Sequence, residues 1–393
     1  MALCMNLVAA LSHNACAFVS KPNARARTGA SLIIRHMTST TSKSNISRID
    51  TLQTLLSKAG APGSIACNQP GDLEPVSVHD GVTMKLHPHL FPIAKSKAQP
   101  DHYICALRRA FADDAMYESS TNSPWPIVET KIDGPGYRLL SLNSEQLMRR
   151  IAAEADGNDD NDSNSNAEDL ISIYNEELGK GSGVVEPEFD DVYEAGSVAK
   201  LGYGASKFCL LRVGPFPDLY EEMAAQHSQK NDESSSLIAA EAANSKFTGF
   251  ASTFKFYAEI LNSFSNREDE GRDAARVCLR LPLPSIGMYT EDVVRVSQMA
   301  GLSKEGEDTA TALNGMKDMY EKIKKHEEED DQGKSSMTPE QLAIEDANSI
   351  LDRMVFVREA DRDWSGVRKE LGDIYCSAGL DDMATFVDPS REA

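Results

Sequence analysis

The chain has 393 residues, of which 41% are hydrophobic, so it is long enough to bury a sizeable core, and its formal net charge is −21. The first 49 residues hold six Lys or Arg and no Asp or Glu, which leaves −27 for the remainder. Because this excess of negative charge repels phosphate groups and no basic patch in the sequence offsets it, we expect no nucleic-acid partner and no anionic membrane partner.

The amino-terminal segment predicts import into a plastid. An apolar run, Leu7–Leu11, precedes the small residues Ala15–Ala17, as at a signal-peptide cleavage site, and the acid-free stretch that follows is rich in Ser, Thr, Ala, Arg and Lys. The junction before Phe18 resembles the bipartite plastid presequence of diatoms and related algae. We expect residues 1–45 to be a signal plus a plastid transit segment, with a disordered or mitochondrial leader as the alternative, and the protein to act in the chloroplast stroma.

Cysteine spacing indicates a reducing compartment, and hydropathy indicates no membrane span. The seven cysteines form no CxxC pair, and no segment after the leader is long and apolar enough to span a membrane. The five later cysteines are expected to be free thiols, and Cys209, Cys278 and Cys376 to be small core residues rather than nucleophiles. The sequence therefore predicts no integral membrane association.

Residues 46–215 are expected to form an irregular α+β region. Leucine spacing predicts a short amphipathic helix over residues 46–58, whereas the many prolines and glycines of residues 61–100 predict a surface wrap without regular elements. The stretch 103–111 fits either a strand or a helix. Strands are predicted over 137–142 and 207–213.

A polar loop interrupts this region. Asn143 with Gln146 three residues later predicts a helix start, and residues 157–166, which are almost all Asn, Asp and Ser, predict a disordered loop. Its alternating acids suggest calcium, but an EF-hand needs Gly and Glu where Asn161 and Ala167 stand, so no calcium site is expected.

Residues 216–325 are expected to form a helical stack, with the most consistent pattern over residues 234–282. Four alanines between residues 239 and 243 allow close helix contacts. An aromatic stripe recurs at helical spacing: Phe250, Phe254, Tyr257 and Leu261. These patterns predict short helices that pack as hairpins.

An acidic linker is predicted over residues 326–337, followed by a helical segment over residues 338–388. Part of that segment matches the spacing of a tetratricopeptide repeat: Leu371, Gly372, Tyr375, Gly379 and Ala384. Arg368 and Asp388 stand where that repeat has large apolar residues. The predicted fold class is mainly α, a helical-hairpin (tetratricopeptide-like) array with a smaller irregular α+β amino-terminal part.

Few residues suggest chemistry. His87, His89, His102 and Cys105 are the densest set of potential metal ligands, with exposed loop histidines as the alternative interpretation. The glycine-rich stretch 201–207 is similar to a protein kinase phosphate loop, with a simple turn into a strand as the alternative. No catalytic motif follows, so we assign no catalytic residue and expect no cofactor; whether the protein is an enzyme stays open, with the balance against it.

From about residue 86 to residue 387 the chain also resembles a chloroplast-stroma protein family of plants and algae. The segments that carry the resemblance are His87–Phe91, Pro124–Val128, Leu201–Tyr220, Ser235–Ala243, Arg272–Pro284 and Gly366–Val387. The resemblance implies a plastid address and brings no catalytic assignment.

The leading functional hypothesis is a stromal helical-repeat protein that acts as a protein-interaction or assembly factor. The alternative is an enzyme or small-ligand-binding protein with its site between the amino-terminal part and the helical stack. The candidate partner contacts are charged residues of the stack, with a solvated helix face as the alternative interpretation: Lys246, Lys255, Glu259, Arg272 and Arg276.

Overall fold

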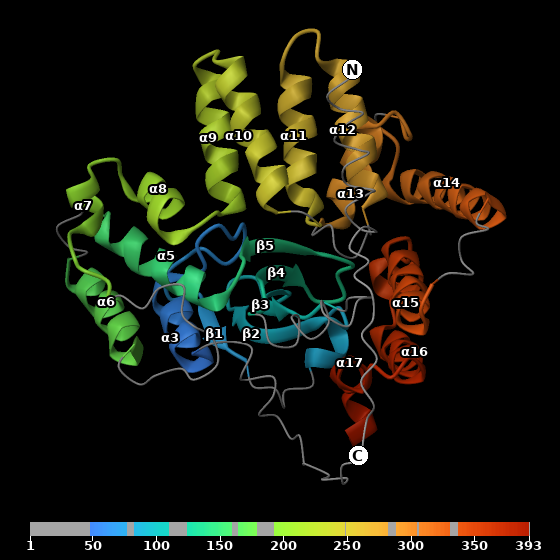
Figure 1. Ribbon diagram of the computed structural model, residues 1–393, viewed down its shortest axis with the longest axis horizontal. Coiled ribbons are helices and arrows are strands. Elements are labelled where there is room, and N and C mark those ends of the chain that lie inside the picture. The colour runs from blue at the N-terminus through green and yellow to red at the C-terminus, as the bar shows by residue number, and fades with distance from the viewer. Residues whose placement is uncertain are drawn as a thin grey trace, which may run out of the picture. The chain divides into compact units, whose positions relative to one another are not determined.

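The computed structural model describes residues 48–76, 82–109, 124–158, 164–178, 192–247, 249–281, 288–304, 306–330 and 337–392 (Figure 1). All of these residues belong to one compact unit that spans residues 39–393. The predicted signal and transit segment, residues 1–45, lies outside the described residues. The described chain is mainly helical with a small sheet in its amino-terminal part, which confirms the predicted fold class.

In the described part of the chain, five strands form one antiparallel sheet in sequence order: β1 (Leu73–Pro75), β2 (Leu90–Ser96), β3 (His102–Leu107), β4 (Ile127–Lys131) and β5 (Tyr137–Ser141). The prediction of an irregular wrap over residues 61–100 is wrong, because β1 and β2 lie within it. Pro92 fits in β2 because the register against β3 shifts between Pro92 and Ala94, where the ladder is already irregular.

Both faces of the sheet are covered. Ile104 and Ala106 of β3 lie in one hydrophobic core with α3 (Ile49–Ala59) and α5 (Ser144–Asp156), and the odd-numbered residues of β3 lie in a second core that includes Phe247 and Phe250. All six residues of β3 are therefore buried. A strand buried on both faces shows no alternation, which is why the sequence left this stretch undecided between strand and helix.

Of the helices beside the first core, α5 begins as predicted, whereas α6 begins earlier than predicted. The Asn143 side chain accepts a hydrogen bond from the Gln146 backbone N–H at 2.7 Å, so α5 begins with the expected cap. The next helix, α6 (Asn164–Leu178), begins inside the loop predicted over residues 157–166, of which 159–163 lie outside the described residues.

The strand predicted over residues 207–213 is wrong. This stretch forms α8 (Ala205–Phe208) and a π-helical turn, η2 (Cys209–Val213), which follow α7 (Ser197–Leu201). Phe208, Cys209 and Val213 are the buried members of the run, and they share the core of α5. Spacing at one helical turn buries them as well as alternation would, and a short apolar run does not distinguish the two.

The helical stack consists of consecutive helices that pack side by side: α9 (Pro217–Gln229), α10 (Glu233–Lys246), α11 (Ala251–Ser263), α12 (Glu268–Arg280) and α13 (Thr290–Met299) (Figure 1). Of the aromatic stripe, Phe250, Phe254 and Leu261 are buried. Phe250 makes an edge contact with the Tyr137 ring of β5, at 6.4 Å between centroids, so the stripe also joins the stack to the sheet.

The carboxyl-terminal helices are α14 (Thr309–Asp330), α15 (Pro339–Val355), α16 (Trp364–Ser377) and α17 (Asp381–Val387). The helix α14 continues to Asp330, into the segment predicted as a linker. Thr338 and Gln341 form the expected capping box of α15. Leu371, Tyr375 and Ala384 are buried in the α15–α17 core, as the repeat spacing requires, while the repeat itself stays a prediction.

One of the two departures from the repeat, Arg368, fixes the position of α16. Arg368 of α16 is completely buried and donates to the carbonyl oxygens of Thr83 at 2.6 Å, Leu86 at 2.8 Å and Val387 at 2.8 Å. Burial lowers its pKa to about 10, with Asp388 acting in the opposite direction. An apolar residue here would leave these carbonyl groups without partners, so the arginine ties α16 and α17 to residues 83–88.

Replacing Arg368 should release the α16–α17 hairpin from the sheet. We expect Arg368→Ala to lower the free energy of unfolding by about 3 kcal/mol, because several buried carbonyl groups lose their donor at once. The two tryptophans of the chain, Trp125 and Trp364, both lie at this junction, so fluorescence during denaturation reports on it. Lys369→Ala, at the exposed neighbouring position, is the matched control, and equal stability of the two variants would contradict the role of Arg368.

Candidate interaction site

A cluster of charged side chains, here called the charged cluster, joins β5 to the helical stack. It consists of Arg138 of β5, Glu221 of α9, Lys255 and Glu259 of α11, and Asp292 and Arg295 of α13. The alternative functional hypothesis places a ligand site in this region, between the amino-terminal part and the stack, and that site stays a prediction.

Each side chain of the charged cluster forms an ion pair with another member of the cluster. Lys255 Nζ lies 2.5 Å from Asp292 Oδ1 and 4.0 Å from Glu259 Oε1, and Arg295 Nε lies 3.0 Å from the same Glu259 oxygen. Arg138 donates to Glu221 at 3.3 Å. Each cation is held by at least one carboxylate, so these groups fix helices to one another and to the sheet.

Glu221 is the titratable member of the charged cluster. Burial raises its pKa from 4.5 to about 7; Asp218 and Glu259 add to the rise, and Arg138 and Lys255 oppose it. Its carboxyl group therefore changes charge near neutral pH, unlike an ordinary glutamate.

The structure brings together two of the five predicted partner contacts. Lys255 and Glu259 share the charged cluster, whereas Arg272 and Arg276 of α12 pair with Asp269 and Asp273, respectively, one turn away. Lys246 lies exposed in the last turn of α10. A partner-binding role for these five residues stays a prediction.

The histidines are buried, contrary to the interpretation of them as exposed loop residues. The His87 and His89 rings lie 5.3 Å apart, and His89 Nε2 is 3.0 Å from the Tyr375 hydroxyl. His102 instead pairs with Asp101, and Cys105 is buried in the second sheet core. Among the described residues no three His, Cys, Asp or Glu side chains gather as metal ligands.

Burial keeps the two neighbouring histidines neutral. The pKa of His87 lies well below its ordinary value because the ring is desolvated, and because His89, Arg368 and Arg362 lie nearby. Burial, with Arg368 and two further arginines, lowers the pKa of His89 to about 3. Protonation of either ring would place a charge in the interface between the sheet and α16, where Tyr375 and Trp364 pack.

The glycine-rich stretch does not form a phosphate loop. Gly202 ends α7 and Gly204 precedes α8, both with positive φ, and the turn leads into a helix rather than the strand that the kinase-like pattern requires. The thiols of Cys105, Cys209 and Cys278 are buried, and burial raises their pKa, so none is a ready nucleophile. Cys376 is exposed, so its prediction as a core residue is wrong.

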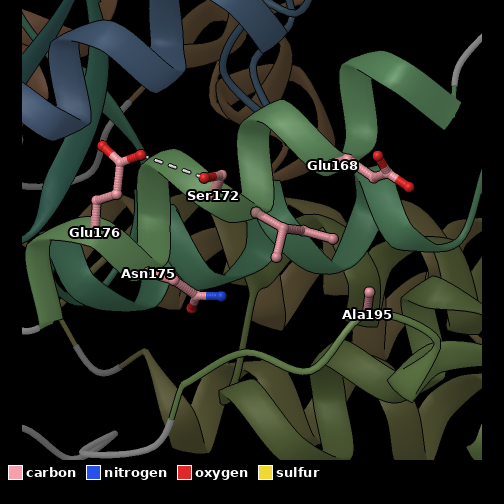
Figure 2. Close-up of a pocket in the computed structure, with 6 residues that line it drawn as sticks. Glu168, Ser172, Asn175, Glu176 and Ala195 are labelled. Atoms are coloured by element: carbon pink, nitrogen blue, oxygen red, sulfur yellow. Dashed lines mark hydrogen bonds between the residues drawn. The ribbon is translucent and has the colours of Figure 1, made fainter.

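A hollow of about 470 Å³ lies between α6 and the segment before α7, and the sequence did not predict it (Figure 2). Its lining residues are Glu168, Ile171, Ser172, Asn175, Glu176 and Ala195. Ser172 donates to Glu176 at 3.3 Å, and the Asn175 amide holds both backbone polar groups of Tyr193. Because the Asn175 amide already bonds to the backbone of Tyr193, the hollow is a boundary between two packed segments and not an assembled reaction site.

No helix of the described residues is long and apolar enough to cross a membrane.

Comparison with known proteins matches the helical parts of the chain. Residues 217–303, which span α9–α13, match the PAB middle domain, and residues 316–390, from within α14 to past α17, match the PAB C-terminal domain. The chain is 28% identical over 273 residues to the Arabidopsis thaliana "Protein IN CHLOROPLAST ATPASE BIOGENESIS, chloroplastic". The match covers 67% of this chain and 72% of the relative. The chain thus resembles a chloroplast protein. No solved structure matches.

The neutral histidines predict acid sensitivity. In the unfolded chain both rings titrate near pH 6.5, while in the folded protein they stay neutral, so the unfolded state binds more protons as pH falls. We expect the free energy of unfolding to fall between pH 7 and pH 5, by about 2 kcal/mol for each histidine at pH 5. Denaturant unfolding should show a smaller fall for His89→Phe than for wild type. His227→Gln on α9 is the control, and an unchanged slope in His89→Phe would refute the assignment.

Glu221 predicts the opposite pH trend. Because its pKa is higher in the folded protein than in the unfolded chain, the stability it contributes is full below about pH 4.5 and is lost as pH rises through 7. We expect the free energy of unfolding of Glu221→Gln, relative to that of wild type, to rise by about 2 kcal/mol from pH 5 to pH 8. Unfolding free energies at four pH values test this, with Glu241→Gln, exposed on α10, as control. A constant difference between Glu221→Gln and wild type would exclude the raised pKa.

Proposed function

We propose that this protein is a plastid assembly factor that takes part in the biogenesis of the chloroplast ATPase through protein contacts. The observation that carries the proposal is the similarity to the Arabidopsis protein over most of both chains, since that protein's name refers to chloroplast ATPase biogenesis. We further propose that it acts in the stroma and reaches there by the leader in residues 1–45.

The placement of the two domain matches supports an interaction role. They coincide with the helical stack and with the carboxyl-terminal helices, the parts of the described chain that present long helix surfaces. The side chains of the charged cluster and the Arg368 contacts hold these helices on the sheet, so the surfaces are presented in a fixed arrangement. A tetratricopeptide-like use of the α16–α17 hairpin would follow from the same geometry.

Complementation tests the proposal directly. In Arabidopsis plants that lack the relative, we expect the amount of assembled chloroplast ATPase to fall, and a plastid-targeted copy of this chain to restore it. Native gel electrophoresis with quantitative detection of ATPase subunits measures the result. A plastid-targeted fluorescent protein, expressed to the same level, is the control. If the chain accumulates in the plastid and the ATPase stays at the level of the control plants, the proposal is wrong.

A further inference from the structure

We propose that an exposed patch formed by Tyr203, Lys207, Leu211 and Arg212, here called the 203–212 patch, binds an acidic amphipathic helix of a protein partner. The proposal rests on the proposed function only for the identity of that partner. The chemistry of the patch is argued from the structure alone.

The patch exposes two large apolar side chains that lie close together in the sequence. Tyr203 is 63% and Leu211 is 64% exposed, and both are among the few large hydrophobic residues on the surface of the described chain. Lys207 Nζ lies 5.4 Å from the centre of the Tyr203 ring, and Lys207 and Leu211 are one helical turn apart across α8 and η2. Tyr203 and Lys207 are therefore in contact, and Leu211 follows about one helical turn further along the chain.

The backbone around the patch holds these side chains outward. Gly202 and Gly204 adopt φ values of +74° and +81°, and a side chain at either position would meet nothing within 4 Å, so the glycines serve the turn and not close packing. The Gly214 backbone N–H donates to the Cys209 carbonyl oxygen at 2.9 Å, the i→i+5 bond of a π turn. Such turns are rare and concentrate at functional sites. This one buries Cys209 and Val213 while it exposes Leu211 and Arg212.

The charge of the patch indicates the partner. Residues 195–217 contain three basic residues and no Asp or Glu, the longest acid-free stretch after residue 50 of a strongly acidic chain. Among the described residues, no carboxylate forms an ion pair with Lys207 or Arg212, whereas Lys200 pairs with Glu194 and the nearby Glu222 bonds to Ser206. Lys207 and Arg212, close in the chain to the exposed Tyr203 and Leu211, match a helix with an apolar stripe flanked by carboxylates.

A designed peptide tests the patch without knowledge of the partner. The probe is a fluorescent peptide of about 20 residues with leucines at helical spacing and glutamates elsewhere, and a second peptide has lysine in place of every glutamate. By fluorescence anisotropy, we expect the wild-type protein to bind the glutamate peptide at least about tenfold more tightly than the lysine peptide, with weaker binding at high salt.

Variants assign the binding to the patch. We expect Lys207→Glu combined with Arg212→Glu to weaken binding of the glutamate peptide about tenfold or more, and Leu211→Ser to weaken it by a similar factor. Lys369→Glu, at an exposed lysine of α16, is the matched control and should bind as wild type does. Unchanged thermal unfolding midpoints show that each variant folds. Equal affinity of the double variant and the Lys369→Glu control would overturn the proposal.

Other occupants of the patch are separate outcomes of the same experiment. Sedimentation that shows a wild-type dimer and a monomeric double variant would assign the patch to a second copy of the chain and overturn the proposal. Patch-dependent binding to vesicles of phosphatidylglycerol and phosphatidylcholine, without peptide binding, would overturn it in favour of a lipid surface.

The plant assay separates this proposal from the proposed function. If a wild-type copy restores the ATPase and the double variant restores it equally, the patch is not the partner surface, although the assembly role stands. If the wild-type copy restores nothing, the assembly role fails, and the peptide measurements still decide the patch.

Discussion

The arrangement of the carboxyl-terminal helices depends on a buried guanidinium that binds backbone carbonyl groups. Arg368 has no carboxylate partner at hydrogen-bond distance in the described structure; it donates instead to carbonyl oxygens of residues 83–88 and of Val387. Arg362 makes the same kind of contact, since its guanidinium donates to the carbonyl oxygens of Asp133, Met354 and Val357. In both arginines, protein carbonyl oxygens replace water as the hydrogen-bond acceptors of the guanidinium group. The buried charge is therefore tolerated only while the helices and the sheet stay together.

Other junctions use the same principle with carboxylates. Arg150 of α5 binds Asp218 of α9 through two parallel hydrogen bonds of 2.7 and 2.5 Å, which links the sheet region to the stack. Glu129 of β4 is completely buried and accepts from Ser64 and from the backbone of Ile65 and Ala66. The polar groups of the interior therefore specify which segments meet, while the apolar cores supply the burial. Such fixed connections suit the proposed assembly role, in which several helix surfaces are held in a constant relation.

Much of the local structure was predictable from the sequence, and the exceptions have physical causes. The caps at Asn143 and Thr338 and the aromatic stripe after Phe250 appear as expected, because each depends on residues within one or two helical turns. The wrap predicted over 61–100 and the strand predicted over 207–213 are wrong. In the first case a register shift accommodates Pro92. In the second the buried apolar residues follow helical spacing and not the alternation of a strand.

The candidate site was less predictable, since it depends on contacts between distant segments. Lys255 and Glu259 were named for their charge, but only the fold shows that Asp292 and Arg295 neutralise them. The loop-like stretch around Pro88 predicts that His87 and His89 are exposed, whereas α16, 286 residues away at the His89–Tyr375 contact, buries them. By itself the sequence determined the helical class, the acidic surface and the helix starts, which arise from composition and from neighbours in the chain. The tertiary structure decided the sheet, the partners of the buried charges and the exposure of Tyr203 and Leu211, because these depend on which distant residues exclude water.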